Sequence, residues 1–168
     1  MNLPLTYTER DETNCCAFPN IHDWDEKIVE FVEKRFIKGY TKSALFVPLN
    51  MGKVMSDLQE RASSAGATMP PREAMILSRD LSPWKAEHLY AVSKTVEGVE
   101  NISLNGKFIA KVFEGPYKNA KEWHATLTAL GKKNGGDGKM NYLFYTTCPN
   151  CAKVYGKNYV IGLSRISE

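Results

Sequence analysis

The order of secondary structure predicted for this chain occurs twice. A strand, a helix and two further strands are predicted in residues 44–94, and the same order is predicted in residues 108–166. Each copy must bury an apolar face, and the other copy is its most economical partner. The repeat therefore predicts one pseudo-duplicated α+β domain over residues 44–168, built from two βαββ copies.

Short β-branched or aromatic runs mark the predicted strands of both copies. In the first copy they are Ala44–Leu49, Ala74–Ser78 and His88–Ser93, and in the second Phe108–Phe113, Met140–Tyr145 and Asn158–Leu163. Apolar residues three or four apart mark the predicted helices. These are Val54, Leu58 and Ala62 in the first copy, and Ala120, Trp123, Leu127 and Leu130 in the second. We expect one concave antiparallel sheet with both helices on one face.

Residues 1–43 precede the repeat and have a different character. Pro19 and the polar run up to Glu26 predict an irregular arm, and the apolar run at 28–32 is too short for its periodicity to separate strand from helix. We expect this N-terminal arm to pack along one edge or end of the two copies. It is too short and too irregular to predict a helix-turn-helix, which argues against a transcription regulator.

Length and composition bound the function classes. A chain of 168 residues with 43% hydrophobic and 24% charged residues is ordinary for one soluble domain. No stretch approaches the roughly 20 apolar residues that span a bilayer, and the N-terminus lacks the pattern of a secretion signal. We therefore expect a cytoplasmic protein without a membrane partner. A net charge of +3, spread along the chain, argues against nucleic acid as a partner.

Four cysteines form two tight pairs, Cys15 with Cys16 and Cys148 with Cys151. Three interpretations stay open from the sequence. The four thiolates could hold a zinc ion, the Cys148/Cys151 pair could be redox-active or reactive, or all four could be small buried residues. Adjacent cysteines can bind one ion only in a tight turn. A thioredoxin fold is excluded, because only 17 residues follow Cys151.

Aromatic side chains are the other prominent feature. We predict that rings wall a groove between the two copies: Trp84, Tyr90, Phe113, Tyr117, Trp123 and Tyr145. Glu87 and Glu114 are the carboxylates nearest to these rings in the sequence, and either could anchor a cation or act as an acid or base. The histidines, including His88, are scattered, and we interpret them as packed or exposed residues rather than catalytic bases.

Four strings in order carry a resemblance to a known family, together with Gly115-Pro116-Tyr117. They run from Pro48 to Met55, from Ser78 to Trp84, from Lys111 to Trp123 and from Thr146 to Tyr159. In these strings and in its duplicated βαββ plan, the chain resembles the GyrI-like small-molecule-binding family. More closely, it is similar to a bacterial and archaeal stand-alone subgroup that is often labelled hydrolase.

This resemblance implies a cleft for bulky, aromatic and often cationic compounds. It also implies hydrolysis of electrophilic or xenobiotic compounds in some relatives, through a tyrosine and a glutamate in that cleft. On this basis Tyr117 or Tyr145 would assist a water molecule activated by Glu87 or Glu114. Where many relatives carry a glutamate in the third strand of the second copy, this chain has Leu143. The Cys148/Cys151 pair is likewise outside the general pattern of the family.

The predicted function is therefore binding of a hydrophobic or aromatic small molecule, with hydrolysis as one possible outcome. The alternative is a zinc-binding or thiol-reactive protein that uses Cys15, Cys16, Cys148 and Cys151. A third class, a partner-binding adaptor, would show neither property. The sequence leaves the oligomeric state and the identity of the ligand open.

Overall fold

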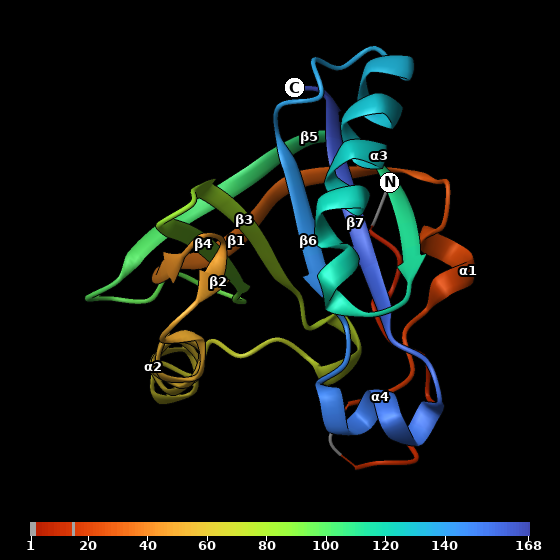
Figure 1. The fold of residues 1–168 in the computed structure, drawn as a ribbon. Coiled ribbons are helices and arrows are strands. Elements are labelled where there is room, and N and C mark those ends of the chain that lie inside the picture. The colour runs from red at the N-terminus through yellow and green to blue at the C-terminus, as the bar shows by residue number, and fades with distance from the viewer. Residues whose placement is uncertain (1–2, 15) are drawn as a thin grey trace. The chain divides into compact units, whose positions relative to one another are not determined.

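Two units make up the fold, each with its own strands and one long helix. The computed structural model describes residues 3–14 and 16–168 (Figure 1). Unit 1 comprises Met1–Val32, Pro71–Glu73 and Asn105–Glu168, and unit 2 comprises Glu33–Pro70 and Ala74–Leu104. The strands β1 and β5 each run from one unit into the other. Each unit is described here by itself.

The elements in chain order have the following bounds. The helices are α1 (Ile21–Trp24), α2 (Met51–Ser64), α3 (Ala120–Lys133) and α4 (Pro149–Tyr155), with 3₁₀ turns at Pro71–Glu73 and Tyr117–Asn119. The strands are β1 (Ile28–Ala44), β2 (Val47–Pro48), β3 (Ile76–Ser82), β4 (Lys85–Ala91), β5 (Glu100–Glu114), β6 (Asn141–Tyr145) and β7 (Tyr159–Ser167). The architecture is mixed α+β.

In unit 2 the strand order is β2-β1-β4-β3, and the pairings of β1 with β2 and β4, and of β3 with β4, are antiparallel. The helix α2 packs on this sheet through Leu58 and Ala62, four residues apart, as the periodicity predicts. Their buried partners in the core of unit 2 are Ile37, Ala67, Val92 and Val96. The α2 helix predicted from Val54, Leu58 and Ala62 is therefore confirmed.

In unit 1 the strand order is β6-β7-β5, with β7 antiparallel to both neighbours. The helix α3 lies on these strands, and Trp123 and Leu127 pack with Phe113, Leu143 and Val160. Gly162 of β7 allows this close approach, because a Cβ there would lie 2.7 Å from both Leu127 Cδ1 and Phe113 Cε2. The helix predicted from Ala120, Trp123 and Leu127 is confirmed.

The two units share one strand arrangement. In unit 2 the long strand β1 pairs with β4, which pairs with β3, and the short strand β2 lies between β1 and α2 in the chain. In unit 1 the strand before the long helix pairs with β7, which pairs with β6. The last strand of each unit therefore lies between two others, β4 between β1 and β3, and β7 between β5 and β6. The element order is β1, β2, α2, β3, β4 in unit 2 and β5, α3, β6, α4, β7 in unit 1. The prediction of one concave sheet with both helices on one face concerns the placement of the units and stays a prediction.

The strand predicted at Ala44–Leu49 is wrong in position. The first strand of unit 2 is β1, a 17-residue strand that begins at Ile28, within the predicted arm. Leu45 and Phe46 instead form the two-residue loop of the β1–β2 hairpin, with φ of 48° and 70°. Bulky apolar residues rarely adopt positive φ, so nothing in the sequence signalled a turn there.

Most of the predicted N-terminal arm belongs to unit 1, and its last part, from Glu33 on, forms the unit 2 portion of β1. Trp24 at the end of α1 is fully buried, and its ring N–H donates to the carbonyl oxygen of Leu5 at 3.0 Å. Asp25 accepts a hydrogen bond from the backbone N–H of Val112 at 2.9 Å, and Lys111 Nζ lies 3.4 Å from the same carboxylate. The arm is thus held by a buried ring and by ion pairs with β5.

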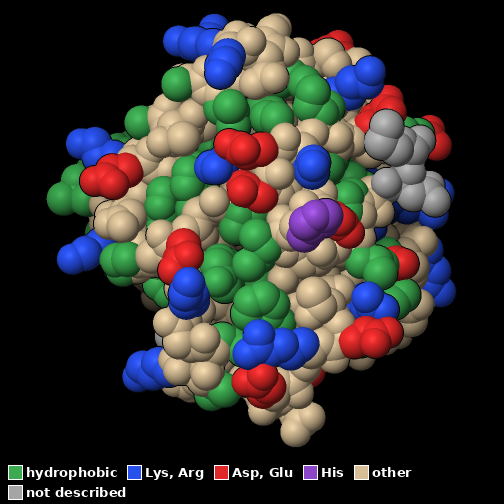
Figure 2. Space-filling model, turned by 90° about the vertical axis from the view of Figure 1, so that its right-hand side faces the viewer, with side chains coloured by type: hydrophobic (Ala, Val, Ile, Leu, Met, Phe, Trp, Pro, Cys, Tyr) green, Lys and Arg blue, Asp and Glu red, His purple; other side chains and the backbone are tan. Residues whose placement is uncertain are grey.

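The surface carries both signs of charge. On the face in Figure 2, Lys and Arg side chains are interspersed with Asp and Glu, among patches of hydrophobic side chains. Interspersed charges largely cancel one another's field, so this face presents no broad region of a single sign. Within the described residues, no helix combines the length and apolar character needed to cross a bilayer.

Candidate functional site

Three cysteines from two distant parts of the chain meet in unit 1. The sulfurs of Cys16, Cys148 and Cys151 all lie within 4.8 Å of one another. Cys148 Sγ and Cys151 Sγ are 3.3 Å apart, and the backbone N–H of Cys148 donates to Cys16 Sγ at 3.5 Å. No disulfide joins these three cysteines. Cys15, the fourth predicted metal ligand, lies outside the described residues.

The start of α4 sets the geometry of the Cys148/Cys151 pair. Cys148 is the N-cap residue of this helix, in an extended conformation with ψ of 162°. Its sulfur accepts a hydrogen bond from the backbone N–H of Cys151 at 3.5 Å. An N-cap side chain folds back over the first helical turn, toward the residue three positions later. The C-x2-C spacing therefore places both sulfurs on one side of the turn.

The segment around Cys16 is held by side chains of unit 1. The backbone N–H of Cys16 donates to Thr13 Oγ1 at 3.0 Å, and the Tyr155 hydroxyl donates to the carbonyl oxygen of Cys16 at 2.7 Å. Thr13 Oγ1 also lies 3.4 Å from Cys151 Sγ. The Tyr155 contact holds the backbone of Cys16 beside α4. Together with the Thr13 contact, it fixes where the Cys16 sulfur lies.

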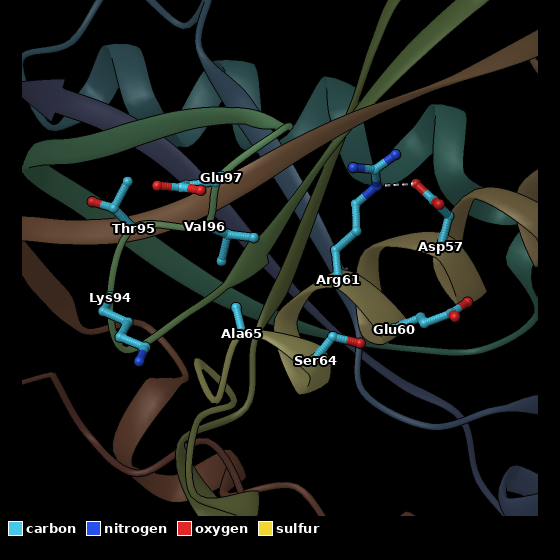
Figure 3. A pocket seen from close by; sticks show the side chains of 9 residues that line it. All are labelled: Asp57, Glu60, Arg61, Ser64, Ala65, Lys94, Thr95, Val96 and Glu97. Carbon is cyan, nitrogen blue, oxygen red and sulfur yellow. Dashed lines mark hydrogen bonds and ion pairs between the residues drawn. The ribbon is translucent and has the colours of Figure 1, made fainter.

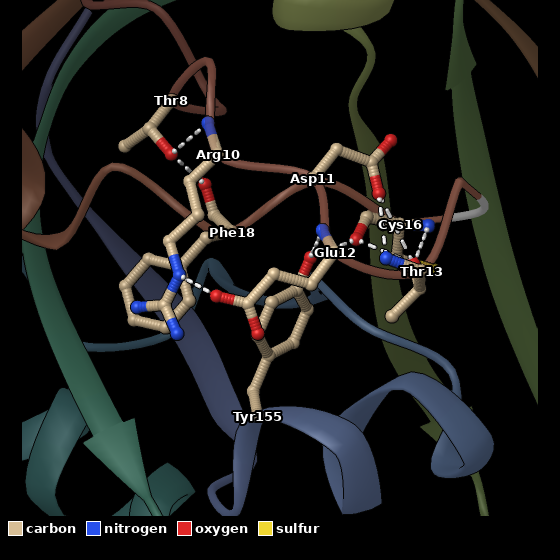
Figure 4. A network of polar contacts seen from close by, with 8 residues as sticks. All are labelled: Thr8, Arg10, Asp11, Glu12, Thr13, Cys16, Phe18 and Tyr155. Carbon is tan, nitrogen blue, oxygen red and sulfur yellow. Dashed lines mark hydrogen bonds and ion pairs between the residues drawn. The ribbon is translucent and has the colours of Figure 1, made fainter.

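A polar network stiffens the loop that leads to Cys16 (Figure 4). Asp11 Oδ1 accepts from the backbone N–H groups of Thr13 and Asn14, at 3.2 and 2.8 Å. The Arg10 guanidinium pairs with Glu12 at 2.6 Å and lies over the Phe18 ring at 4.6 Å. Side-chain to backbone bonds of the Asp11 kind are typical of fixed turns. The loop is therefore preorganised before any ligand binds.

Two phenols donate to the backbone just before Cys148. The Tyr117 hydroxyl donates to the carbonyl oxygen of Thr147 at 3.0 Å, and the Tyr7 hydroxyl to that of Thr146 at 2.8 Å. Burial raises the pKa of Tyr117, and the nearby Cys148 and Cys16 raise it further. The pKa of Tyr7 is raised for the same reasons, burial first and then Cys16. Both phenols therefore remain protonated donors at neutral pH.

Two of the predicted ligand-binding rings lie beside this cluster. The rings of Tyr117 and Tyr145 meet edge to face, with centroids 5.3 Å apart. Tyr117 is 38% exposed and Tyr145 is half-buried. Because Tyr117 also bonds the residue before Cys148, the tyrosine pair and the cysteine cluster form one continuous region of unit 1. The structure thus brings together residues that were predicted for two different functions.

The other predicted residues of unit 1 have different surroundings. Phe113 and Trp123 stack at 5.7 Å and are buried in the core, so they have little surface to offer a ligand. Glu114 is exposed at the end of β5, where its carboxylate lies 3.4 Å from Lys157 Nζ. Its location at the surface is compatible with contact to a solute.

Three predicted site residues belong to unit 2. Glu87 is buried on β4 between Arg79 and Lys38, with N–O distances of 3.0 and 3.3 Å. Tyr90 is half-buried and packs against the core of unit 2, whereas Trp84 is 60% exposed. Two cations already compensate Glu87, which weakens its attraction for a cationic ligand. The predicted groove between the two copies, and catalysis by Glu87 or Glu114, stay predictions.

A known protein family matches most of the chain. The model of a family described as bacterial hydrolase matches residues 6–166. The chain belongs to the bacterial hydrolase family. The match covers both units, and it agrees with the hydrolase-labelled subgroup that the sequence resembles. No curated protein gives a significant match to this member of the bacterial hydrolase family.

In this bacterial hydrolase family member, sequence reasoning missed a buried polar cluster in unit 2. His88 is 1% exposed; its Nδ1 lies 2.8 Å from Ser78 Oγ and its Nε2 lies 2.9 Å from Thr41 Oγ1. Burial lowers the pKa of His88 to about 4, and the smaller effect of Glu87 acts in the opposite direction. The imidazole is therefore neutral at pH 7, with one nitrogen donating and the other accepting. The β3–β4 register pairs Ser78 with His88, and the sequence alone does not reveal this register.

Unit 2 of the bacterial hydrolase family member also has an open depression between α2 and the segment after β4 (Figure 3). Its lining is mostly polar: Asp57, Glu60, Arg61, Ser64, Ala65, Lys94, Thr95, Val96 and Glu97. Arg61 is already engaged, with Asp57 at 2.8 Å and with the carbonyl oxygen of Gly98 at 3.0 Å. None of the nine lining residues is a predicted site residue, so the cysteine cluster remains the stronger candidate.

Proposed function

We propose that the cysteine cluster of unit 1 binds one zinc ion and that this ion fastens the segment around Cys16 to the start of α4. The observation that carries this proposal is the convergence of three sulfurs within 4.8 Å of one another. Two of them come from one helical turn and the third from a segment 132 residues earlier. Such a bridge would stabilise unit 1 in the way that structural zinc stabilises small folds.

Zinc fits this donor set better than a harder ion. Thiolates are soft ligands, and a zinc ion with Zn–S bonds of about 2.3 Å places tetrahedral ligand sulfurs about 3.8 Å apart. The Cys148–Cys151 separation of 3.3 Å lies close below this value, so small rotations would complete the geometry. Cys15 is the predicted fourth ligand. Four thiolates would close the coordination sphere, and the zinc would then be structural rather than catalytic.

Metal analysis tests the zinc site directly. Protein purified without a histidine tag is expected to contain about one zinc per chain, because the thiolates hold the ion through purification. Cys148→Ser and Cys16→Ser are each expected to reduce zinc to below about a tenth of that content. Asn150→Ser changes an exposed residue of the same turn without removing a thiol, and it should retain the metal.

Two outcomes would contradict the zinc proposal. One is wild-type protein with far less than one zinc per chain after refolding in excess zinc. The other is equal zinc content in Cys148→Ser and Asn150→Ser. A Cys148–Cys151 disulfide found by mass spectrometry in freshly prepared protein would favour the redox interpretation instead.

A second candidate function is supported by the family match. We propose that the protein binds hydrophobic or aromatic small molecules, including electrophilic xenobiotic compounds, and hydrolyses them. The resemblance to the GyrI-like fold is supported by the shared strand arrangement of the two units. In unit 1 the Tyr117/Tyr145 pair would supply the ring contacts, since edge-to-face aromatic pairs extend readily to a third ring.

The proposed chemistry uses groups of unit 1. Glu114 would accept a proton from a water molecule while the oxygen of that water attacks an electrophilic carbon of the substrate. A tyrosine hydroxyl of the pair would donate a proton to the substrate oxygen that develops negative charge in this step. The product would carry the hydroxyl of the water on the attacked carbon. Tyr117 and Tyr145 are the candidates for this role, and Glu87 in unit 2 stays the predicted alternative base.

Dye binding tests the small-molecule proposal separately from the zinc. An aromatic cationic dye is expected to bind saturably, and Tyr145→Ala should weaken binding about tenfold, because a ring contact contributes roughly 1.4 kcal/mol. Tyr40→Ala is the control, since Tyr40 is 38% exposed, as is Tyr117 of the pair, but lies in unit 2 outside the predicted set. Fluorescence anisotropy gives the dissociation constants. Equal affinities for wild type and Tyr145→Ala would reject the tyrosine pair as the site.

A further inference from the structure

Two neighbouring hairpin turns of unit 2 expose large apolar side chains to solvent. One turn joins β1 to β2 and the other joins β3 to β4. We call their exposed side chains the hairpin patch: Leu45, Phe46, Val47, Leu49, Leu81 and Trp84. Exposure reaches 71% at Leu45 and 60% at Trp84. Single exposed apolar residues are normal, but a contiguous group of this size indicates a binding surface.

Backbone hydrogen bonds join the two turns into one surface. The N–H of Ser43 donates to the carbonyl oxygen of Trp84 at 2.8 Å, and the N–H of Phe46 donates to that of Pro83 at 2.9 Å. The β1–β4 register continues directly into this junction through Lys42 and Lys85. The patch is therefore a property of the paired strands and does not depend on two independent loops.

The first turn is strained in a way that burial does not offset. Leu45 and Phe46 both have positive φ, in a two-residue loop where Asn-Gly is the favoured sequence. Left-handed backbone is unfavourable for such residues, because Cβ approaches the following carbonyl oxygen. Yet both side chains are more than half exposed. Strain that persists without packing inside the chain indicates a function that needs these side chains at the tip.

Three lysines lie next to the hairpin patch in the strand register or in the sequence. Lys42 on β1 lies directly opposite Lys85 on β4, and Lys53 is in the first turn of α2, just after Leu49. Like charges directly opposite one another on paired strands are unfavourable. No ion pair involves any of these three lysines in the part of the chain that the structure describes, although Lys85 Nζ lies over the Tyr40 ring at 4.2 Å. An anionic partner would relieve this repulsion.

We propose that the hairpin patch docks on the surface of a bilayer that contains anionic lipids. Leu45, Phe46 and Trp84 would insert at the level of the headgroups, where aromatic and aliphatic side chains partition together. Lys42, Lys53 and Lys85 would then bind lipid phosphates electrostatically. This proposal revises the sequence-based expectation of no membrane partner, which considered spanning segments and not surface binding.

Charge and edge geometry favour a lipid surface over a second copy of the chain. A symmetric dimer through the patch would bring the lysines of both copies together, which adds repulsion. Strand addition at β2 is also disfavoured, because Pro48 removes a backbone donor from this two-residue outer strand. A fluid anionic surface needs neither a matching groove nor a free strand edge.

Vesicle co-sedimentation tests the proposal with a variant that relieves strain. Wild type is expected to bind vesicles of phosphatidylcholine with about a quarter phosphatidylglycerol at least tenfold more tightly than phosphatidylcholine alone. The double change Leu45→Asn and Phe46→Gly installs the favoured turn sequence, so it should raise thermal stability while reducing vesicle binding about tenfold or more. Val154→Asn removes a side chain that is 58% exposed on α4, and it should bind like wild type.

Lysine removal and tryptophan fluorescence identify the inserted surface. Lys42→Gln is expected to weaken binding to the anionic vesicles about fivefold. Trp84 is the exposed tryptophan, whereas Trp24 and Trp123 are 0% and 5% exposed. Lipids brominated on their acyl chains should therefore quench the emission of wild type and leave that of Trp84→Phe unchanged.

Three outcomes would overturn the proposal. The first is equal affinity of the wild type for neutral and anionic vesicles. The second is an affinity of the Leu45→Asn, Phe46→Gly variant for anionic vesicles that equals that of the wild type. The third is a concentration-dependent dimer, formed without lipid and abolished in that variant, because it would assign the hairpin patch to a second copy. Loss of vesicle binding in the double variant would not be explained by unfolding, since the stability of this variant is expected to rise and not fall.

Discussion

Trp24→Ala is expected to lower the free energy of unfolding by about 4 kcal/mol, the usual range for removing a buried tryptophan. The side chain is fully buried in unit 1, and its ring N–H donates to the carbonyl oxygen of Leu5 at 3.0 Å. Truncation leaves a large cavity and a carbonyl group without its donor. Urea denaturation followed by far-UV circular dichroism measures the loss.

Trp84→Ala provides the matched control for this prediction. The same residue type is 60% exposed in unit 2, so its removal should change stability by less than about 0.5 kcal/mol. A cost below about 1 kcal/mol for Trp24→Ala would contradict the burial of the arm in unit 1. The result also bears on the zinc proposal, because Cys16 lies in the same arm and contacts α4.

Stability is expected to fall by about 3 kcal/mol between pH 6.5 and pH 4 because of His88 alone. Burial lowers the pKa of His88 in the folded protein to about 4, whereas the unfolded chain has the ordinary value of about 6.5. As the pH falls through this window, the unfolded state takes up a proton that the folded state resists. The contribution is therefore complete above pH 6.5 and is lost on acidification.

Urea denaturation at several pH values, with His88→Gln beside wild type, measures this contribution. The variant should lose the His88 part of the slope between pH 4 and pH 6.5, while the acidic residues keep theirs. His22→Gln is the comparison for removal of an exposed histidine, because the side chain of His22 is 94% exposed. Parallel curves for His88→Gln and wild type would show that His88 titrates normally in the folded state.

The cysteine cluster and the tyrosine pair lie close enough to influence one another. Tyr117 donates to the carbonyl oxygen of Thr147, the residue before the proposed ligand Cys148. A metal that orders the start of α4 would thereby order one ring of the proposed ligand site. A structural zinc and a small-molecule site are compatible in one unit, and the separate variants Cys148→Ser and Tyr145→Ala distinguish their effects.

The two long helices were predictable because their signal is local, whereas the short helices α1 and α4 were not predicted. Apolar residues three or four apart mark α2 and α3, and the same residues, Leu58 with Ala62 and Trp123 with Leu127, are buried in the structure. Most of the strands were also recognised, although their ends shifted. β1 was the exception, because its apolar run begins inside a polar arm and ends in a turn formed by Leu45 and Phe46.

The sequence by itself therefore determined the α+β class, the helices α2 and α3 and the C-x2-C spacing of Cys148 and Cys151, since periodicity and spacing act over a few residues. Folding decided which distant residues meet. Cys16 joins Cys148 across 132 positions, and Ser78 and Thr41 enclose His88. Strand register and chain reversal set these contacts, and both depend on the packing of the whole unit rather than on any local pattern.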